Sequence, residues 1–516
     1  MKITVNSKYL VFPVNSRLSK KRLTFSIDGN IVYELNIKLD NTNPDFYAYI
    51  DISRFNGKEL DINISPEMKL CFTEENAMPS EDIYKEPLRP QIHFTAKNGW
   101  LNDPNGLIYV DGKYHMFYQH NPCEADWENM HWGHAVSEDM LHWEEKDIAL
   151  FPDSTGKMYS GSAMLDEKNL LGFNVGDKPA VLLFYTATSP YSQHIAYSTD
   201  NLETIHKYEN NPVVPHITRG NRDPSVVFCR EIDAYVMALY LTENFYGILI
   251  SKDLKNWEKV QEVYLPDDSE CPDIFPISTA NGTRKWVIMG AKDTYLVGDF
   301  SGNCFVQCQD HKKLHFGNSS YAGQTISNMP CGRTVRMVWD RGGLRTTAFS
   351  SQMMMPYDLE LEEINGVYYL SAKPIKEIDS LAVCKSKYEN LLIDKDAPQK
   401  FCLNNKPHII KLCGKIKAGT KLDFNLFGYR FLCDLAERKL KYKSFSAPLA
   451  DFSDDYELTV ITDTSSIELY CNGGKAYITD STAFSDCNLS YLHISSNTDC
   501  TVEKLEITEL ESVWHK

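Results

Sequence analysis

The chain has 516 residues, of which 43% are hydrophobic and 24% are charged, and its formal net charge is −17. This length exceeds one ordinary core and predicts two or three domains. An acidic chain without a block of basic residues is a poor ligand for nucleic acids or anionic membranes, and no run reaches the roughly 18 to 20 apolar residues of a membrane span.

The N-terminus reads MKITVNSKYLVFPVN, in which Asn6, Ser7 and Lys8 interrupt any apolar core of a signal peptide. The 14 cysteines are scattered without paired C-x-x-C spacing, so neither a zinc site nor a small disulfide framework is indicated. Reduced thiols in a cytoplasmic protein are the simplest interpretation. A secreted protein whose leader had been removed would look the same.

Short alternating apolar runs prevail and helical periodicity is scarce, so the sequence predicts an all-β protein. Residues 1–85 hold short strands such as Leu23–Ile27, Ile31–Ile37 and Phe46–Ile50, which predict a small N-terminal β domain. The polar, proline-bearing stretch from Glu74 to Pro90 is typical of a linker to the main body.

Residues 86–375 repeat a local pattern. AVSEDMLHW, AYSTDNLET and LISKDLKNW each hold an apolar strand followed by Ser, one residue, Asp and a turn. The serines are Ser137, Ser198 and Ser251, with spacings of 61 and 53 residues. Periods near 50 are typical of a propeller whose blades are four-stranded sheets.

Five hairpins of one type predict five blades, and they follow Asp103, Tyr159, Asp223, Glu270 and Tyr321. If each hairpin is the inner pair of its blade, the turns before the hairpins meet at one end of the central channel. The three acids Asp103, Asp223 and Glu270 would then be neighbours although they lie far apart in sequence.

The pattern changes after the fifth hairpin. Met353–Ile378 is expected to form the strand pair that closes the propeller. Residues 376–516 contain short strands and turns such as Asn472-Gly473-Gly474, which favour a C-terminal β-sandwich.

Three acids at one place have three interpretations. Each could be a turn residue, since Asp-Pro is a common turn pair. Together they could bind Ca²⁺, because carboxylate oxygens suit a hard cation. They could also cleave a glycosidic bond, which needs one ionised carboxylate as nucleophile and one protonated acid for the leaving oxygen.

The residues around the acids favour the glycosidic interpretation. Arg222 precedes Asp223 and is expected to keep it ionised, while crowding by the other acids and apolar neighbours is expected to raise the pKa of Glu270. Aromatic side chains that could stack on a sugar ring lie near the same hairpins. They are Trp100, Trp127, Tyr159, Tyr321 and Trp339.

The motifs WLNDPNG, RDP and ECPD, in this order, resemble those of glycoside hydrolase family 32, which comprises invertases and fructan hydrolases. YHMFYQHNP followed by WENMHWGHAVSEDMLHWE is similar to a second region of the family, and YSGS, YAGQT and SIELYCNGGKAYIT to three further motifs. The resemblance runs from Gln91 to the C-terminus. YLVFPV and the strands after it are similar to an extra β domain that precedes some levanase-like members.

The resemblance implies a five-bladed β-propeller followed by a β-sandwich, retention of anomeric configuration, a fructoside substrate and no metal or other cofactor. By position, Asp103 is the nucleophile, Glu270 is the general acid and then the base, and Asp223 holds fructosyl hydroxyls and stabilises the transition state. The implied fructose pocket is formed by Asn102, Gln119, Trp127, Ser160 and Arg222, with Tyr159 where the family has Phe. Further implied members of the site are Cys271, Tyr321 and Trp339.

The chain departs from the family pattern at three points. Leu101 replaces the Met of W-M-N-D-P-N-G, Val338 precedes Trp339 where the family has Gly, and MPYDL lacks the Arg of L-P-R-E-L. None of these departures touches the three acids.

Several alternatives stay open. A fructosyltransferase would use the same acids, and a sucrose-6-phosphate hydrolase would need a cationic rim that Lys292 or Arg219 could supply. A non-catalytic carbohydrate-binding propeller, or a structural propeller with the acids as turns, needs no complete acid set. His131, His134 and His142 could suggest a metal, but packing is the expected role, and a homo-oligomer is compatible with the sequence.

Overall fold

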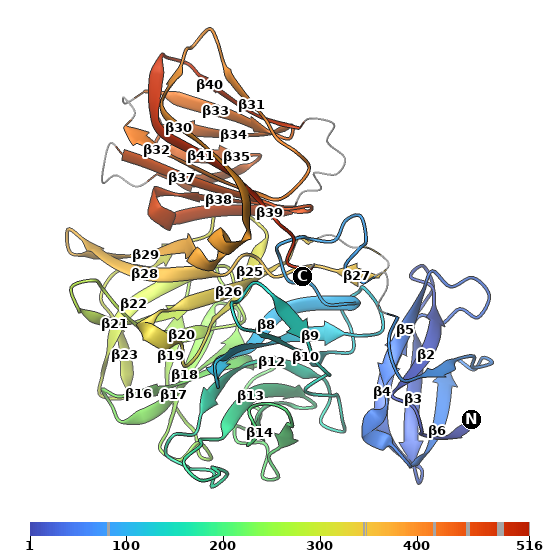
Figure 1. Cartoon of the computed structure of the whole chain (residues 1–516). Helices are drawn as coiled ribbons and strands as arrows, with labels where there is room; N and C mark the ends of the chain where they lie inside the picture. The colour runs from blue at the N-terminus through green and yellow to red at the C-terminus, as the bar shows by residue number, and fades with distance from the viewer. Residues whose placement is uncertain are drawn as a thin grey trace.

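A computed structural model describes residues 1–79, 83–343, 346, 348–415, 419–449, 455–481 and 490–514. Within these ranges the chain forms two small sheets at the N-terminus, five sheets in the middle and two six-stranded sheets at the C-terminus (Figure 1). The predicted fold class is correct: a five-bladed β-propeller is followed by a β-sandwich and preceded by a small β unit. Helices in these ranges are short 3-10 turns, none long and apolar enough to cross a membrane.

The N-terminal part packs its two sheets around one apolar core in which Leu10, Phe12, Leu23 and Phe25 are fully buried. Alternate residues of each strand point inward, as the period of a strand requires. The four-stranded sheet has the order β1 (Lys2–Thr4), β6 (Glu59–Ser65), β3 (Lys21–Ile27) and β4 (Asn30–Ile37). The three-stranded sheet has the order β5 (Phe46–Asp51), β2 (Tyr9–Val14) and β7 (Thr73–Glu75), and a turn η1 (Ser53–Phe55) follows β5. The three strands predicted here are β3, β4 and β5.

The four main strands of each propeller blade are antiparallel, and the first of them is the innermost. The first blade consists of β8 (Gly99–Val110), β9 (Lys113–Asn121), β10 (His131–Ser137) and β11 (Trp143–Glu145). The second consists of β12 (Met158–Leu165), β13 (Val181–Thr188), β14 (Tyr191–Ser198) and β15 (His206–Lys207). The third consists of β16 (Arg222–Cys229), β17 (Ala234–Thr242), β18 (Phe245–Ser251) and β19 (Glu258–Tyr264). The fourth is β20 (Asp273–Ser278), β21 (Arg284–Met289), β22 (Thr294–Ser301) and β23 (Cys304–Gln307), with β24 (Lys312–Lys313) also on β22, and the fifth is β25 (Ser320–Thr325), β26 (Val335–Asp340), β28 (Tyr357–Ile364) and β29 (Val367–Pro374).

The five predicted hairpins are the inner strand pairs of the five blades, and the pair predicted to close the propeller is β28–β29. The ring closes between the fifth and first blades. There β27 (Phe349–Ser350) pairs in parallel with β8, and Ser327 exchanges backbone hydrogen bonds with Leu107 and Tyr109. A turn η2 (Pro330–Gly332) joins β25 to β26.

The repeated Ser-x-Asp pattern forms a turn after the third strand of three blades, one residue longer in the second blade than in the other two. The hydroxyl oxygens of Ser137, Ser198 and Ser251 accept the backbone N–H of Met140, Leu202 and Leu254, respectively, each at 2.9 Å. These three acceptor turns place Met140, Leu202 and Leu254 in the left-handed region, with φ between 63° and 68°. The sequence repeat therefore corresponds to the structural repeat of the propeller blades.

The C-terminal sandwich buries Phe424, Leu458, Leu469 and Leu505 between its two sheets. One sheet has the order β30 (Ala382–Ile393), β41 (Cys500–Leu510), β32 (His408–Lys415), β37 (Asp455–Thr462), β38 (Ser466–Cys471) and β39 (Ala476–Ser481). The other has the order β31 (Gln399–Cys402), β40 (Tyr491–Ser496), β33 (Lys421–Leu426), β34 (Tyr429–Asp434), β35 (Lys439–Tyr442) and β36 (Phe445–Pro448). The turns η3 (Lys376–Leu381) and η4 (Asn472–Gly474) precede β30 and β39.

The stretch predicted as a linker, Glu74–Pro90, contains no strand among its described residues beyond its first two. At its start β7 runs to Glu75, and near its end the Arg89 side chain is fully buried, donates to Thr95 Oγ1 at 2.8 Å and lies 3.6 Å from the ring centroid of Phe349. Polar composition predicts exposure, but a guanidinium can be buried when its donors are satisfied and its face covers an aromatic ring. Residues 80–82 of this stretch lie outside the described ranges.

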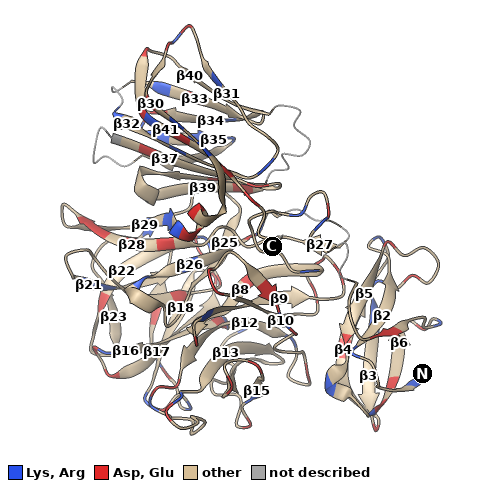
Figure 2. Ribbon diagram, viewed as in Figure 1, with Lys and Arg blue, Asp and Glu red and all other residues tan. Residues whose placement is uncertain are grey.

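Charged residues of both signs are interspersed along the ribbon in all three parts (Figure 2). Some fully buried charged groups join the propeller to the sandwich. Both ring nitrogens of His93, just before β8, face carboxylates of the sandwich: Nδ1 is 2.8 Å from Asp463 and Nε2 is 2.7 Å from Glu468. Burial by itself would lower the pKa of His93, but the two hydrogen-bonded carboxylates raise it to about 10.

His93→Asn is expected to lower the free energy of unfolding by about 3–5 kcal/mol near neutral pH, because it leaves two buried carboxylates without their cation. The pKa of His93 in the folded protein, about 10, lies above its ordinary value of about 6.5. The stabilisation is therefore complete below pH 6.5 and is lost as the pH rises towards 10. Unfolding midpoints measured from pH 6 to 10 should converge for the two proteins, whereas His142→Asn, at a partly exposed pair, should change little. A deficit that stays constant over this range would contradict the assignment.

Candidate functional site

The three acids predicted to converge do meet, around a cavity of about 250 Å³ at the start of the inner strands. The cavity is lined by Asn102, Asp103, Gln119, Trp127, Tyr159, Ser160, Arg222, Asp223, Glu270, Cys271, Tyr321, Trp339 and Arg341. All the residues that the sequence assigned to the site line it, except Trp100.

Bulges at one level of the ring turn these side chains inward. The register of the inner hairpin shifts between Leu101 and Pro104 in the first blade, and at the corresponding place in three other blades. The other shifts lie between Tyr159 and Gly161, Arg222 and Ser225, and Tyr321 and Gln324. A bulge adds an unpaired residue and redirects its neighbours. The motifs NDPNG, SGS, RDP and YAGQ therefore mark the four bulges.

Two of the acids stand on unusual backbone. Asp223 has φ of 64° within its bulge, and Glu270 and Cys271, directly before β20, have φ of 60° and 38°. Left-handed conformations are uncommon for residues with a side chain and are found at functional sites when the surroundings enforce them. The backbone N–H of Asp223 donates to Thr186 Oγ1 at 3.0 Å, which helps to hold this conformation.

Asp103 is held by donors from two other blades. The Ser160 hydroxyl donates to its Oδ2 at 2.6 Å, and the Cys271 thiol lies 3.5 Å from the same oxygen. Burial raises the pKa of Asp103 and the charge of Glu270 raises it further, while the Ser160 hydrogen bond opposes both effects. Asp103 and Glu270 are thus close enough to interact electrostatically.

Asp223 is the most deeply buried of the three acids. Its Oδ2 accepts the Cys271 N–H at 3.1 Å and lies 3.5 Å from the Cys271 thiol and 3.7 Å from Arg222 Nε. Burial, opposed by Arg222 and assisted by the charges of Asp103 and Glu270, raises the pKa of Asp223 to about 7. Arg222 does lower the pKa of Asp223, but a single cation does not offset burial and two neighbouring acids, so the expectation of an ionised Asp223 was wrong near neutral pH.

Arg222 makes its closer ion pair with Glu270, through Nη2 and Oε1. The Tyr321 hydroxyl donates to the other carboxylate oxygen, Oε2. Burial alone would raise the pKa of Glu270, but Tyr321 and Arg222 lower it overall. The expected rise in the pKa of Glu270 was therefore also wrong for the unliganded protein, since its nearest neighbours are a donor and a cation.

Of the aromatic residues assigned to the site, Trp127, Tyr159, Tyr321 and Trp339 line the cavity and Trp100 packs behind them. Trp127 is 46% exposed at the rim, with its ring centroid 6.2 Å from that of Tyr159. Trp100 lies behind the wall, where its Nε1 donates to Asn102 Oδ1 at 2.7 Å and its ring meets that of Trp339 at 5.8 Å. Trp100 therefore orients two lining residues and does not face the cavity.

The sequence missed one lining residue, Arg341. Its guanidinium lies 4.6 Å from the centroid of the Tyr321 ring, and its charge contributes to lowering the pKa of Glu270. Arg341 follows β26 directly, and its place one residue beyond the fifth inner hairpin was the available signal. The two cations that the sequence suggested for the rim, Lys292 and Arg219, do not line this cavity.

The three histidines that could have suggested a metal have separate partners. His131 is 2.7 Å from the Tyr33 hydroxyl, His134 stacks on His115 and His142 pairs with Asp139. The three histidines thus pack against or pair with other side chains, which is the role predicted from the sequence.

Comparison with known proteins identifies the family. The model of the glycosyl hydrolases family 32 N-terminal domain matches residues 93–373, and that of the family 32 C-terminal domain matches residues 431–509. The chain belongs to glycoside hydrolase family 32. The family-32 motifs WLNDPNG, RDP and ECPD carry the three acids that surround the cavity.

The similarity to individual members of family 32 extends beyond the propeller. A levanase of Bacillus subtilis is 30% identical over 501 residues, 87% of this chain and 74% of that protein. A fructan beta-fructosidase of Streptococcus mutans is 34% identical over 385 residues, 67% of this chain and only 26% of that protein. The structure of fructofuranosidase from Schwanniomyces occidentalis complexed with fructose matches with a TM-score of 0.73 and 25% identity, covering 84% of this chain and 100% of that one.

Asp223→Asn is expected to stabilise the protein at pH 8, by on the order of 2–4 kcal/mol. The pKa of Asp223 is about 7 when folded and about 3.9 when unfolded, so folding is penalised once the pH rises above 3.9 and the penalty is complete above 7. Asn retains an acceptor for the Cys271 N–H without the charge. Unfolding midpoints at pH 4 and pH 8 test this, and a variant no more stable than the parent at pH 8 would refute it.

Proposed function

We propose that the protein is a retaining β-fructofuranosidase that releases β-D-fructose from sucrose or from fructans. The observation that carries the proposal is the convergence of Asp103, Asp223 and Glu270 from three blades on one small cavity. The names of the family-32 relatives, a levanase, a fructan beta-fructosidase and a fructofuranosidase, support this substrate class.

Two carboxylates perform the proposed chemistry. Asp103 attacks the anomeric C2 of the fructosyl unit while Glu270 protonates the leaving oxygen, which gives a covalent fructosyl-enzyme. Glu270 then removes a proton from water, which attacks C2, releases β-fructose and frees Asp103. Ser160 and the Cys271 thiol, as donors to Asp103, stabilise its charge in the free enzyme and again when the ester breaks.

Glu270 must be protonated for the first step, whereas Arg222 and Tyr321 favour its charged form in the unliganded protein. Entry of a neutral sugar removes water from the cavity and thereby raises the pKa of a carboxyl group. In the proposed cycle, substrate binding therefore shifts Glu270 to its protonated form. Asp223, beside both other acids, is placed to accept sugar hydroxyls and to stabilise positive charge that develops at the anomeric carbon.

Asp103→Asn is expected to reduce turnover of sucrose, inulin and levan by about 10³-fold or more, since the amide is no nucleophile. The matched control is Asp111→Asn, the same change in the turn between β8 and β9 of the same blade. Initial rates and circular dichroism spectra should show an inactive but folded Asp103→Asn variant and an active control. Near-normal rates from folded Asp103→Asn would reject the proposal, and formation of oligosaccharides from the parent protein at high sucrose would favour a fructosyltransferase.

Arg341 supports a second candidate, a sucrose-6-phosphate hydrolase. Its guanidinium is exposed at the edge of the cavity, and guanidinium groups bind phosphate by paired hydrogen bonds. This residue supplies the cationic rim that the 6-phosphate interpretation requires.

If sucrose 6-phosphate is the substrate, Arg341→Gln should lower kcat/KM for it by about tenfold or more, the size of one charge-assisted contact. The same substitution should change kcat/KM for sucrose far less. Parallel assays of both sugars with both proteins decide between the candidates. An equal loss on both sugars would mean that Arg341 acts through Tyr321 and Glu270. The β-fructofuranosidase would then be the supported function.

A further inference from the structure

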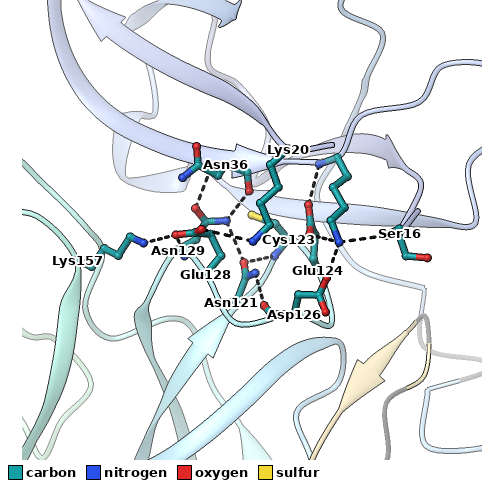
Figure 3. Close-up of polar contacts among 11 residues, drawn as sticks. Ser16, Lys20, Asn36, Asn121, Cys123, Glu124, Asp126, Glu128, Asn129 and Lys157 are labelled. Atoms are coloured by element: carbon teal, nitrogen blue, oxygen red, sulfur yellow. Dashed lines mark hydrogen bonds and ion pairs between the residues drawn. The ribbon is translucent and has the colours of Figure 1, made fainter. Parts of the chain in front are cut away.

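The N-terminal part meets the propeller at the segment that carries Trp127, residues 122–130 between β9 and β10 (Figure 3). Trp127 lines the cavity and is 46% exposed, so it forms part of the rim. No strand includes this segment, so its position depends on side-chain contacts. Several of those contacts come from the N-terminal part.

Lys38, the residue after β4, makes several of these contacts through both its backbone and its side chain. Its backbone N–H donates to Glu124 Oε1 at 2.7 Å, and its Nζ lies 3.4 Å from Glu124 Oε2 and pairs with Asp126. Nζ also donates to the carbonyl of Ser16 at 3.1 Å. The side chains of Lys38 and Glu124 are only 11% and 2% exposed, so water screens this pair far less than a surface ion pair.

Two further contacts join the N-terminal part to the residues that follow Trp127. Asn36 of β4 and Asn129 form a reciprocal pair: the Asn36 N–H donates to the Asn129 amide oxygen and the Asn129 amide donates to the Asn36 carbonyl, both at 2.8 Å. Lys20 Nζ lies 3.4 Å from Glu128. The partners of the N-terminal part therefore include both sequence neighbours of Trp127, residues 126 and 128.

Hydrogen bonds of Asn121, the last residue of β9, connect these contacts to the backbone beside Trp127. The Asn121 amide donates to the carbonyl of Asp126, the residue before Trp127, at 2.8 Å, and its oxygen accepts Cys123 N–H at 3.1 Å and Asn129 Nδ2 at 3.2 Å. Cys123 itself is buried in the apolar core of the N-terminal part. Asn121 therefore links the residue before Trp127 to Cys123 and Asn129, both of which contact the N-terminal part.

The second blade completes the frame around Trp127. Lys157, directly before β12, pairs with Glu128, and its Nζ lies 5.1 Å from the centroid of the Trp127 ring. Another ion pair, Lys8 with Asp147, also joins the N-terminal part to the propeller, but neither residue lines the cavity. Attachment of the N-terminal part to the propeller would require only ion pairs such as Lys8–Asp147, whose residues do not line the cavity.

We propose that the N-terminal part positions Trp127, with Lys38 as the positioning residue, and so sets how tightly the protein binds the portion of the substrate at the cavity rim. This inference rests on the proposed function. Lys38 touches no reacting atom and acts only through the segment that carries Trp127.

The test compares Lys38→Met, which keeps the aliphatic stem and removes the charge, with Lys8→Met at the other ion pair. Lys38→Met should raise KM for sucrose and levan roughly three- to thirtyfold, the range of coupling between contacting residues, with kcat changed less than about twofold. Lys8→Met should leave both parameters near those of the parent protein, and Lys38→Arg should restore most of the lost affinity.

A double-mutant cycle with Trp127→Ala separates positioning from general destabilisation. If Lys38 acts through Trp127, Lys38→Met should have no further effect on KM in the Trp127→Ala background. Equal effects in both backgrounds, an unchanged KM in folded Lys38→Met, or the same rise in Lys8→Met would each overturn the proposal. If Lys38→Met does not fold, Asp126→Asn removes a partly exposed partner of Lys38 and should give the same KM pattern.

The proposed function and this inference can fail separately. Calorimetric titration of sucrose into Asp103→Asn protein, with and without Lys38→Met, measures affinity without turnover. A parent protein that hydrolyses no fructoside would reject the proposed function, while weaker sucrose binding caused by Lys38→Met would still support positioning. Equal affinities in this titration would reject the positioning role even in an active enzyme.

Discussion

Mutual repulsion of three carboxylates in a cavity of about 250 Å³ is the constraint around which the site is arranged. Arg222 is the cation in direct contact with the cluster, pairing with Glu270 and lying 3.7 Å from Asp223. Arg222 is itself fixed, since it donates to the Gly220 carbonyl at 2.5 Å and lies 4.6 Å from the Tyr240 ring centroid. Neutral donors complete the set, so each acid has a partner that favours its charged form.

The ring of blades makes this arrangement possible because its inner strands are joined to one another. Gln324 of the fifth blade donates to the Gly161 carbonyl of the second at 3.0 Å and accepts the Leu107 N–H of the first at 3.2 Å. Asp273, at the start of β20, pairs with the buried Arg336 at 2.9 Å. Bonds of this kind hold strained residues in place, as a site that must keep like charges together requires.

The two flanking parts are attached in different ways and differ in their relation to the site. The sandwich is attached through fully buried groups such as His93, which does not line the cavity. The N-terminal part is tied through polar contacts of Lys38 and Asn36 to the segment that carries Trp127. A rigid inner ring thus fixes the acids, and a separate unit supports the rim.

The sequence by itself determined the strands, the number of blades and the identity of the acids, because alternation, turn residues and motif order are local features. It did not determine that Arg222 pairs with Glu270, that Trp100 stands behind the wall, or that Arg341 reaches the rim. The domain boundaries and the catalytic roles stay predictions. Tertiary structure decided the distribution of charge and the support of Trp127, because a pKa and a side-chain position depend on neighbours that different blades and a separate N-terminal part bring within a few ångströms.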